Sequence, residues 1–178
     1  MTLEGLNTIL AYGTVLAQLA SVAILVALFA AKTSPLARDA LDLVARWGMW
    51  LSLVAVFVAS ALTLVYSEYF GLPPCPLCWW QRAFLYPQVV LIALGLYIRD
   101  RAAAFYACIF SVIGAGVALY HHLLQVMPAG SLPCPAEGTV SCAQRFVFEF
   151  GYITFPMMAF SIFVLLALVQ LVVYRRSA

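Results

Sequence analysis

Apolar residues fall along the chain in five long runs that contain almost no charged side chains. A helix needs roughly 20 apolar residues to cross a bilayer core about 30 Å thick, and each run reaches about that length. Backbone groups in hydrocarbon must bond within their own segment, so each run predicts a transmembrane helix and not a strand. The predicted spans cover about Asn7–Ala31, Trp47–Val65, Trp79–Ile98, Ala102–Leu124 and Ile153–Tyr174.

Basic residues are distributed unevenly between these runs. Cytoplasmic segments of membrane proteins carry an excess of Lys and Arg, and this excess sets the orientation of the helices. Five crossings place seven of the nine basic residues on one side, which is therefore predicted to be cytoplasmic together with the C-terminus. The N-terminus and both cysteine-bearing loops are then predicted to lie outside. The seven residues are Lys32, Arg38, Arg46, Arg99, Arg101, Arg175 and Arg176.

The composition excludes a water-soluble fold. Of 178 residues, 66% are hydrophobic and 9% are charged, whereas soluble domains carry about 25% charged residues. The net charge of +2 is too small and too dispersed to indicate nucleic-acid binding, so membrane lipid is the expected surrounding. The first run is typical of a lipid-facing helix, although Gly13 and Gln18 within it indicate a helix contact or a cavity.

A Cys-x-x-Cys pair precedes the third run. Pro76 suits the first position of a helix, which places Cys78 in the first helical turn after Cys75. The helix dipole and free N–H groups there stabilise a thiolate, so the pair is predicted to be redox-active. Trp79 follows Cys78, so the His required for covalent haem attachment is missing.

Arg82 follows Cys78 by four residues and is expected on the same helical face, one turn deeper. Two interpretations remain open for it. The guanidinium either reaches back to the membrane surface, or it stabilises a thiolate at Cys78 and an oxygen of a bound cofactor.

A second pair, Cys134 and Cys142, lies in the later outer loop, which is rich in Pro and Gly. Such a loop can present a disulfide to a soluble protein. Two pairs on one side of the membrane can exchange through mixed disulfides, so together they predict a relay. Cys108 lies inside the fourth run and is expected to act as a small hydrophobe. His121 and His122, near the outer end of that run, are either interfacial residues or donors to a bound cofactor.

Electrons that enter such a relay need an acceptor. The chain has no Gly-x-Gly-x-x-Gly motif for a flavin, no haem motif, and too few cysteines for both a relay and an iron–sulfur cluster. An oxidant dissolved in the membrane remains, and a quinone accepts the two electrons and two protons of one dithiol. A quinone, either ubiquinone or menaquinone, is therefore the predicted cofactor.

From about Ala45 to Tyr174 the chain resembles the bacterial disulfide bond formation protein B family, DsbB. The resemblance rests on Cys75-Pro-Leu-Cys78 with Arg82, on Tyr120-His-His-Leu-Leu-Gln125, and on Cys142-Ala-Gln-Arg145. It implies an all-α integral membrane fold: a four-helix transmembrane bundle over residues 45–178, preceded by one additional transmembrane helix and a cytoplasmic loop in residues 1–44. It also implies the bacterial cytoplasmic (inner) membrane, with the cysteine loops on the periplasmic side.

The resemblance further implies a reaction and roles for individual residues. A reduced, DsbA-like thioredoxin-fold partner would attack Cys134 and release Cys142, which would attack Cys75 so that Cys78 leaves as a thiolate. Arg82 would polarise that thiolate and the quinone, and His121 would lie near the quinone ring. Cys78, Arg82 and His121 are thus the expected cofactor contacts. The loop between Cys134 and Cys142 is shorter than in the best-known family members.

Three other functions compete with this interpretation. The four loop cysteines could bind zinc or copper, although thiolates outside the cytosol tend to oxidise, so no metal site is predicted. The disulfides could merely brace the loops. A quinone reductase of the vitamin K epoxide reductase type also couples a Cys-x-x-Cys to a loop pair, but there the loop pair comes first in the chain.

Overall fold

The computed structural model describes residues 2–128, 131–134 and 140–176. In these residues the chain forms five long α-helices and one short π-helix, with no strand beyond an isolated bridge between Glu149 and Ile153. All five α-helices are long and apolar enough to cross a membrane, which confirms the predicted all-α membrane fold. The elements are α1 (Leu3–Ala30), α2 (Pro35–Leu64), η1 (Val65–Tyr69), α3 (Pro76–Ile98), α4 (Ala102–Val126) and α5 (Phe155–Arg175).

Helix starts are set by capping side chains more than by hydropathy. Ser34 caps α2, and Pro35 follows in its first turn, so α2 begins well before Trp47, where the span was predicted to start. The predicted loop between the first two spans is therefore mostly helical, and Arg38 and Arg46 belong to α2. Hydropathy misses these turns because they mix charged and apolar residues.

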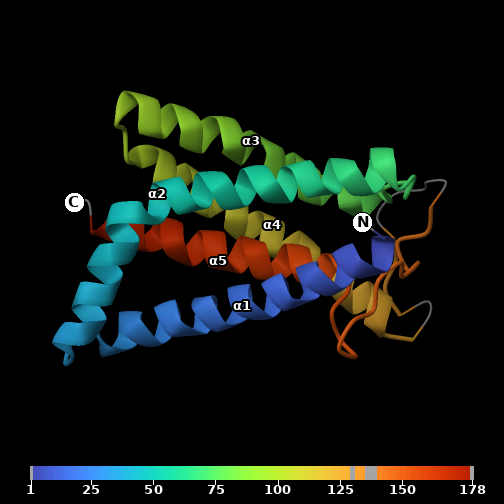
Figure 1. Cartoon of the computed structure of the whole chain (residues 1–178), viewed down its shortest axis with the longest axis horizontal. Coiled ribbons are helices and arrows are strands. Elements are labelled where there is room, and N and C mark those ends of the chain that lie inside the picture. Colours follow the sequence, from blue (N-terminus) through green and yellow to red (C-terminus); the bar gives the residue numbers. More distant parts are fainter. Residues whose placement is uncertain (1, 129–130, 135–139, 177–178) are drawn as a thin grey trace.

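Four helices form a closed bundle, and the fifth packs beside it. Successive neighbours α2, α3, α4 and α5 contact one another in a ring, while α1 contacts α5 and α2 (Figure 1). The N-terminus lies at the same end of the bundle as the two cysteine-bearing segments, and the C-terminus lies at the opposite end (Figure 1). Segments 31–34 and 99–101, which carry Lys32, Arg99 and Arg101, share that opposite end.

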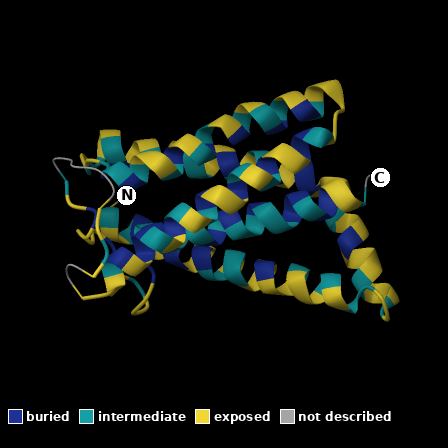
Figure 2. Ribbon diagram, turned by 180° about the vertical axis from the view of Figure 1, so that it is seen from behind, coloured by how far each residue is buried: buried dark blue, intermediate teal, exposed yellow. Residues whose placement is uncertain are grey.

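The bundle core combines close helix contacts with a few polar pairs. Gly114 of α4 lies against Phe163 of α5, where a Cβ atom would approach the Phe163 ring to 2.6 Å. Small residues at such crossings let membrane helices pack closely. The buried Ser111 hydroxyl donates to Gln88 Oε1 over 2.9 Å and links α4 to α3. Exposed residues lie on the outward faces of the helices (Figure 2), and many of them are large and apolar, as expected for contact with lipid.

Candidate redox site

Cys75 and Cys78 lie where the chain enters α3. Gly71, with a φ of 66°, turns the chain after η1, and the two following prolines lead it to Cys75. Cys75 is the N-cap of α3, and its Sγ accepts a hydrogen bond from the Cys78 backbone N–H over 3.3 Å. Cys78 therefore lies in the first helical turn, as predicted. Both cysteines are free thiols, and their Sγ atoms are 2.7 Å apart.

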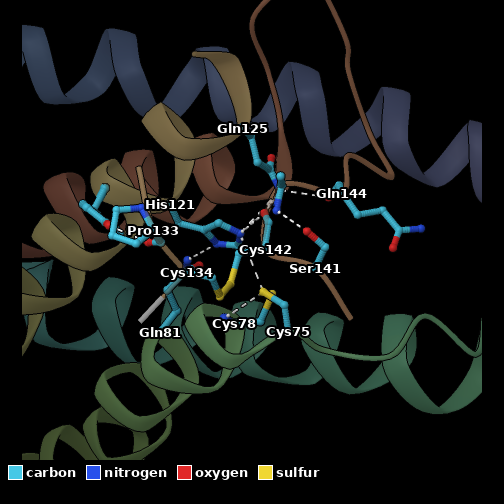
Figure 3. Close-up of a disulfide and its surroundings, with 12 residues drawn as sticks. Cys75, Cys78, Gln81, His121, Gln125, Pro133, Cys134, Ser141, Cys142 and Gln144 are labelled. Atoms are coloured by element: carbon cyan, nitrogen blue, oxygen red, sulfur yellow. Dashed lines mark hydrogen bonds between the residues drawn. A yellow bond between two sulfur atoms is a disulfide. The ribbon is translucent and has the colours of Figure 1, made fainter. Parts of the chain in front are cut away.

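Cys134 and Cys142 form a disulfide beside this pair. Cys134 is exposed, whereas Cys142 is only 1% exposed. Cys142 lies near Cys75 (Figure 3), and both belong to one buried cluster with Leu77 and Leu124. The structure thus brings the two predicted pairs together. The Cys134–Cys142 disulfide reaches the protein surface, and Cys75 and Cys78 lie at the start of α3.

His121 of α4 lies between the two pairs (Figure 3). Its Nε2 is 3.6 Å from Cys75 Sγ and 3.1 Å from the Cys142 carbonyl oxygen. The Gln81 amide nitrogen lies 2.9 Å from Nδ1 and the Gln125 amide nitrogen lies 3.4 Å from Nε2, so two glutamines hold the ring beside the sulfur and the carbonyl oxygen. His121 is 1% exposed, and it is therefore buried rather than interfacial.

Two glutamines around this histidine were missed from the sequence. Gln81 fixes the His121 ring, and Gln125 donates to the carbonyl oxygens of Cys142 and Gln144 over 3.3 and 3.0 Å. The available signal was spacing, because Gln81 follows Cys78 by three residues and Gln125 follows His121 by four. His122 is also buried, but its Nδ1 contacts the Thr154 hydroxyl over 2.9 Å and not a sulfur.

Cys75 lies just outside the membrane-spanning part of α3, and its surroundings favour the thiolate form by lowering its pKa. The hydrogen bond from the Cys78 thiol is the main cause that lowers the pKa of Cys75, and the His121 N–H and the Cys78 backbone N–H add to it against the effect of burial. From sequence, the thiolate is expected at Cys78. Cys75 occupies the capping position and receives these N–H groups, and a thiolate at Cys78 stays a prediction.

Arg82 is buried in the bundle, which favours the interpretation that its guanidinium points inward. Its side chain is 8% exposed, its Nη2 donates to the Thr63 carbonyl oxygen over 2.8 Å, and its Cζ lies 5.2 Å from the Trp79 ring centroid. A buried cation of this kind needs partners, and the structure supplies a carbonyl oxygen and an aromatic face.

A cavity of about 550 Å³ begins at Cys78 and Arg82, and its size is typical of small-molecule sites. Cys78, Gln81 and Arg82 line its outer end, and the rest is almost entirely apolar. Its wall follows α2 and the start of η1 from Leu51 to Tyr66, a length on the order of 20 Å at the rise of an α-helix. His121 does not line it, so of the three expected cofactor contacts only Cys78 and Arg82 face this space.

Cys108 lies apart from the relay. Its thiol donates to the Ala167 carbonyl oxygen over 3.5 Å within the α4–α5 contact, which agrees with its predicted role as a small core residue. The alternative of a metal bound by all four loop cysteines does not match the arrangement of these residues. Cys75, Cys78 and His121 place three potential ligand atoms within 4.8 Å of one another, but Cys134 and Cys142 are bonded to each other.

Comparison with known proteins agrees with this site. The sequence model described as "Disulfide bond formation protein DsbB" matches residues 45–173, which leaves α1 outside. A probable disulfide formation protein C of Halalkalibacterium halodurans is 36% identical over 130 residues, covering 73% of this chain and 93% of the relative. The SPbeta prophage-derived disulfide bond formation protein B of Bacillus subtilis is 39% identical over 110 residues, covering 62% and 74%.

A probable disulfide formation protein of Metapseudomonas resinovorans is 34% identical over 134 residues, covering 74% of this chain and 92% of the relative. No solved structure matches the chain. The family model covers both cysteine pairs, Arg82 and His121. The chain therefore belongs to the DsbB family of disulfide bond formation proteins.

Proposed function

We propose that the protein is a membrane dithiol:quinone oxidoreductase that reoxidises a DsbA-like thioredoxin-fold protein and so sustains disulfide bond formation outside the cytoplasm. The order of four sulfurs carries this proposal. Cys134 is exposed, Cys142 is buried beside Cys75, and Cys78 lines a cavity among the membrane helices. Electrons therefore have a short path from a surface disulfide to the membrane.

The reaction begins as thiol–disulfide exchange. A partner thiolate attacks Cys134 Sγ, the disulfide breaks, and Cys142 leaves as a thiolate. Cys142 then attacks Cys75 of an inner Cys75–Cys78 disulfide, and Cys78 leaves as a thiolate. The second thiolate of the partner then attacks the partner's own sulfur in the mixed disulfide, which releases oxidised partner and frees Cys134. Cys134 attacks Cys142 in the Cys142–Cys75 disulfide and frees Cys75. The outer disulfide is thereby restored and the inner pair is reduced, which is the pairing seen in this structure.

A bound quinone, ubiquinone or menaquinone, would supply the oxidant, since a quinone accepts the two electrons and two protons that the inner dithiol gives up when it returns to a disulfide. The cavity suits such a molecule, since a polar end with Cys78, Gln81 and Arg82 continues into an apolar space. Arg82 holds a fixed positive charge at that end. His121 keeps charge on Cys75 during exchange and holds the Cys142 backbone in place.

The orientation that this function needs agrees with the distribution of charge. Both cysteine pairs lie at the end of the bundle away from the basic segments 31–34 and 99–101. The positive-inside rule would place that cysteine end outside the cytoplasm, in a bacterial inner membrane, where disulfides persist.

The test is turnover by the purified protein. Reduced thioredoxin-fold protein and a short-chain quinone are mixed with wild type, Cys78→Ser or Cys108→Ser, and loss of quinone absorbance is followed. Wild type and Cys108→Ser are expected to turn over, and Cys78→Ser is not. A Cys78→Ser variant as active as wild type would refute the mechanism, and so would a wild type that oxidises the partner without consuming quinone.

A second variant tests the cavity. Arg82→Gln removes the buried cation and is expected to raise the KM for quinone about tenfold or more, because a lost charged hydrogen-bond donor costs about 1.5–3 kcal/mol. Its rate of mixed-disulfide formation at Cys134 is expected to stay unchanged. An Arg82→Gln variant with wild-type KM would place the quinone elsewhere.

A further inference from the structure

The cavity wall includes a helix that the family model leaves out. Residues 45–173 match that model, yet α1 contributes Leu10, Gly13, Thr14 and Ala17 to the lining. The four-helix bundle alone would leave this side of the cavity more open to lipid. In this chain, α1 closes part of it.

Polar contacts hold α1 in this position. Gln18 Nε2 donates to the Ser161 hydroxyl of α5 over 3.0 Å, and the Tyr152 hydroxyl donates to Gln18 Oε1 over 2.8 Å. Near the outer end, the buried Tyr66 hydroxyl donates to Asn7 Oδ1 over 2.6 Å. Hydrogen bonds between helices stabilise helix packing in the membrane, so these bonds hold α1 against the cavity as part of its wall.

The Asn7 contact also reaches the cavity itself. Tyr66 lies in η1, a π-helical turn of the kind that often marks functional sites, and it lines the cavity. Its ring packs edge-on against Phe155, with centroids 4.6 Å apart. Asn7 therefore fixes a side chain that borders the outer part of the cavity.

Gly13 leaves the space between α1 and α2 open. A glycine inside a helix is less favourable than Ala by about 0.8–1.0 kcal/mol. Gly114 allows a close helix crossing, but a Cβ added at Gly13 would meet no atom within 4 Å. No described atom lies close to where a Gly13 side chain would begin, so the missing side chain leaves room in the cavity that Gly13 lines.

We infer that α1 forms the side wall of a channel for the prenyl tail of the quinone, with Gly13 setting its width; this inference rests on the proposed function. The occupant is a molecule with a polar head and a long apolar tail. All polar lining apart from Thr14, Thr63 and the Tyr66 hydroxyl lies beside Cys78, and the apolar part extends on the order of 20 Å, which exceeds a quinone ring. Leu51 and Val54 line the cavity and are exposed, so a tail can enter from the membrane.

The test compares two glycines that differ only in location. Gly116 in α4 is also helical, exposed and free of atoms within 4 Å of a Cβ, but it does not line the cavity. Gly13→Phe is expected to raise the KM for a long-tailed quinone about tenfold and to leave the KM for a tail-less quinone unchanged. Gly116→Phe is expected to match wild type with both. Gly13→Leu replaces Gly13→Phe if the larger side chain prevents folding.

A binding measurement accompanies these kinetics. A quinone with a photoreactive group in its tail is cross-linked to wild-type protein in lipid nanodiscs, and adducts are mapped by mass spectrometry. Adducts within residues 10–17 of α1, lost in Gly13→Phe and kept in Gly116→Phe, are the expected result. Labelling of that segment by a photoreactive phospholipid but not by the quinone would overturn the inference and identify a lipid chain as the occupant.

Two kinetic outcomes would also overturn it. Equal KM values for Gly13→Phe and Gly116→Phe with the long-tailed quinone would show that α1 does not line the channel for the tail. An equal loss with the tail-less quinone would show that Gly13 acts on the ring site and not on the tail. A wild type that reduces neither quinone would instead refute the proposed function, so the two failures are distinguishable.

Discussion

Cys75 and Cys78 lie at the capped start of a long helix, whereas Cys134 and Cys142 lie in residues that are not helical. The inner pair is fixed by hydrogen bonds from the α3 backbone and from His121. The two cysteines of the outer pair differ in solvent exposure instead, because Cys134 is exposed and Cys142 is buried. One pair is thus held beside a membrane cavity, and the other is open to a soluble protein.

The difference indicates how one small protein can present one cysteine pair to the membrane interior and the other to the aqueous phase. An electron donor to a membrane cofactor, the role proposed for the inner pair, needs a fixed distance and a site that excludes water, and a helix start among membrane helices provides both. A disulfide that a protein partner attacks needs an exposed sulfur and a backbone able to adjust. His121 contacts both pairs and is the described residue that connects these two requirements.

Removing single sulfurs of the outer pair gives the largest expected effect. Cys142→Ser leaves Cys134 able to bond to the partner but cannot pass electrons on, so it is expected to trap a mixed disulfide and to show no quinone reduction. Cys134→Ser is expected to form no such complex with the partner. Non-reducing gels with reduced thioredoxin-fold protein distinguish the two. The reverse pattern would make buried Cys142 the point of attack and break the comparison.

Changing the histidine between the pairs gives an intermediate effect. The lowered pKa of Cys75 keeps its thiolate present as pH falls below the ordinary thiol range, about 8.5. His121→Ala removes one cause of that shift, so the pKa of Cys75 is expected to rise and the thiolate to appear only at higher pH. Ultraviolet thiolate absorbance of the reduced protein against pH measures this in a Cys108→Ser background.

His122→Ala is the matched control, because that side chain contacts Thr154 and no sulfur. Its titration is expected to follow wild type. A His121→Ala profile that coincides with the control would assign the low pKa of Cys75 to Cys78 and the helix start alone.

Much of this architecture could be predicted from the sequence because it follows local rules. Five apolar runs gave five helices, and Pro76 after Cys75 gave a capped helix start with Cys78 in its first turn. Capping also explains why the predicted start of the second helix was too late, since Ser34 and Pro35 start α2 before its apolar stretch. A hydropathy window responds to average composition and not to a cap.

The site around His121 and the cavity depends on contacts between distant residues, and the sequence did not reveal them. Gln81 and His121 are separated by 40 positions. Gly13 and Gln18 indicated a contact or a cavity in the first helix, and the structure shows both. Neither residue could identify the facing helix, because hydropathy shows which segments span the membrane and not which of their faces meet.

The smallest expected effect concerns how firmly the outer pair is held. The Tyr120 hydroxyl of α4 donates to the Pro133 carbonyl oxygen over 2.7 Å, next to Cys134. Tyr120→Phe removes this bond and is expected to speed hydrogen exchange in residues 131–134 by at most about fivefold, the equivalent of about 1 kcal/mol. Tyr106→Phe on the same helix, far from either cysteine pair, is the control. If exchange is unchanged while partner oxidation slows, the hydroxyl acts on the exchange reaction and does not tether the segment, and the contrast between a fixed and an adaptable pair would then need another origin.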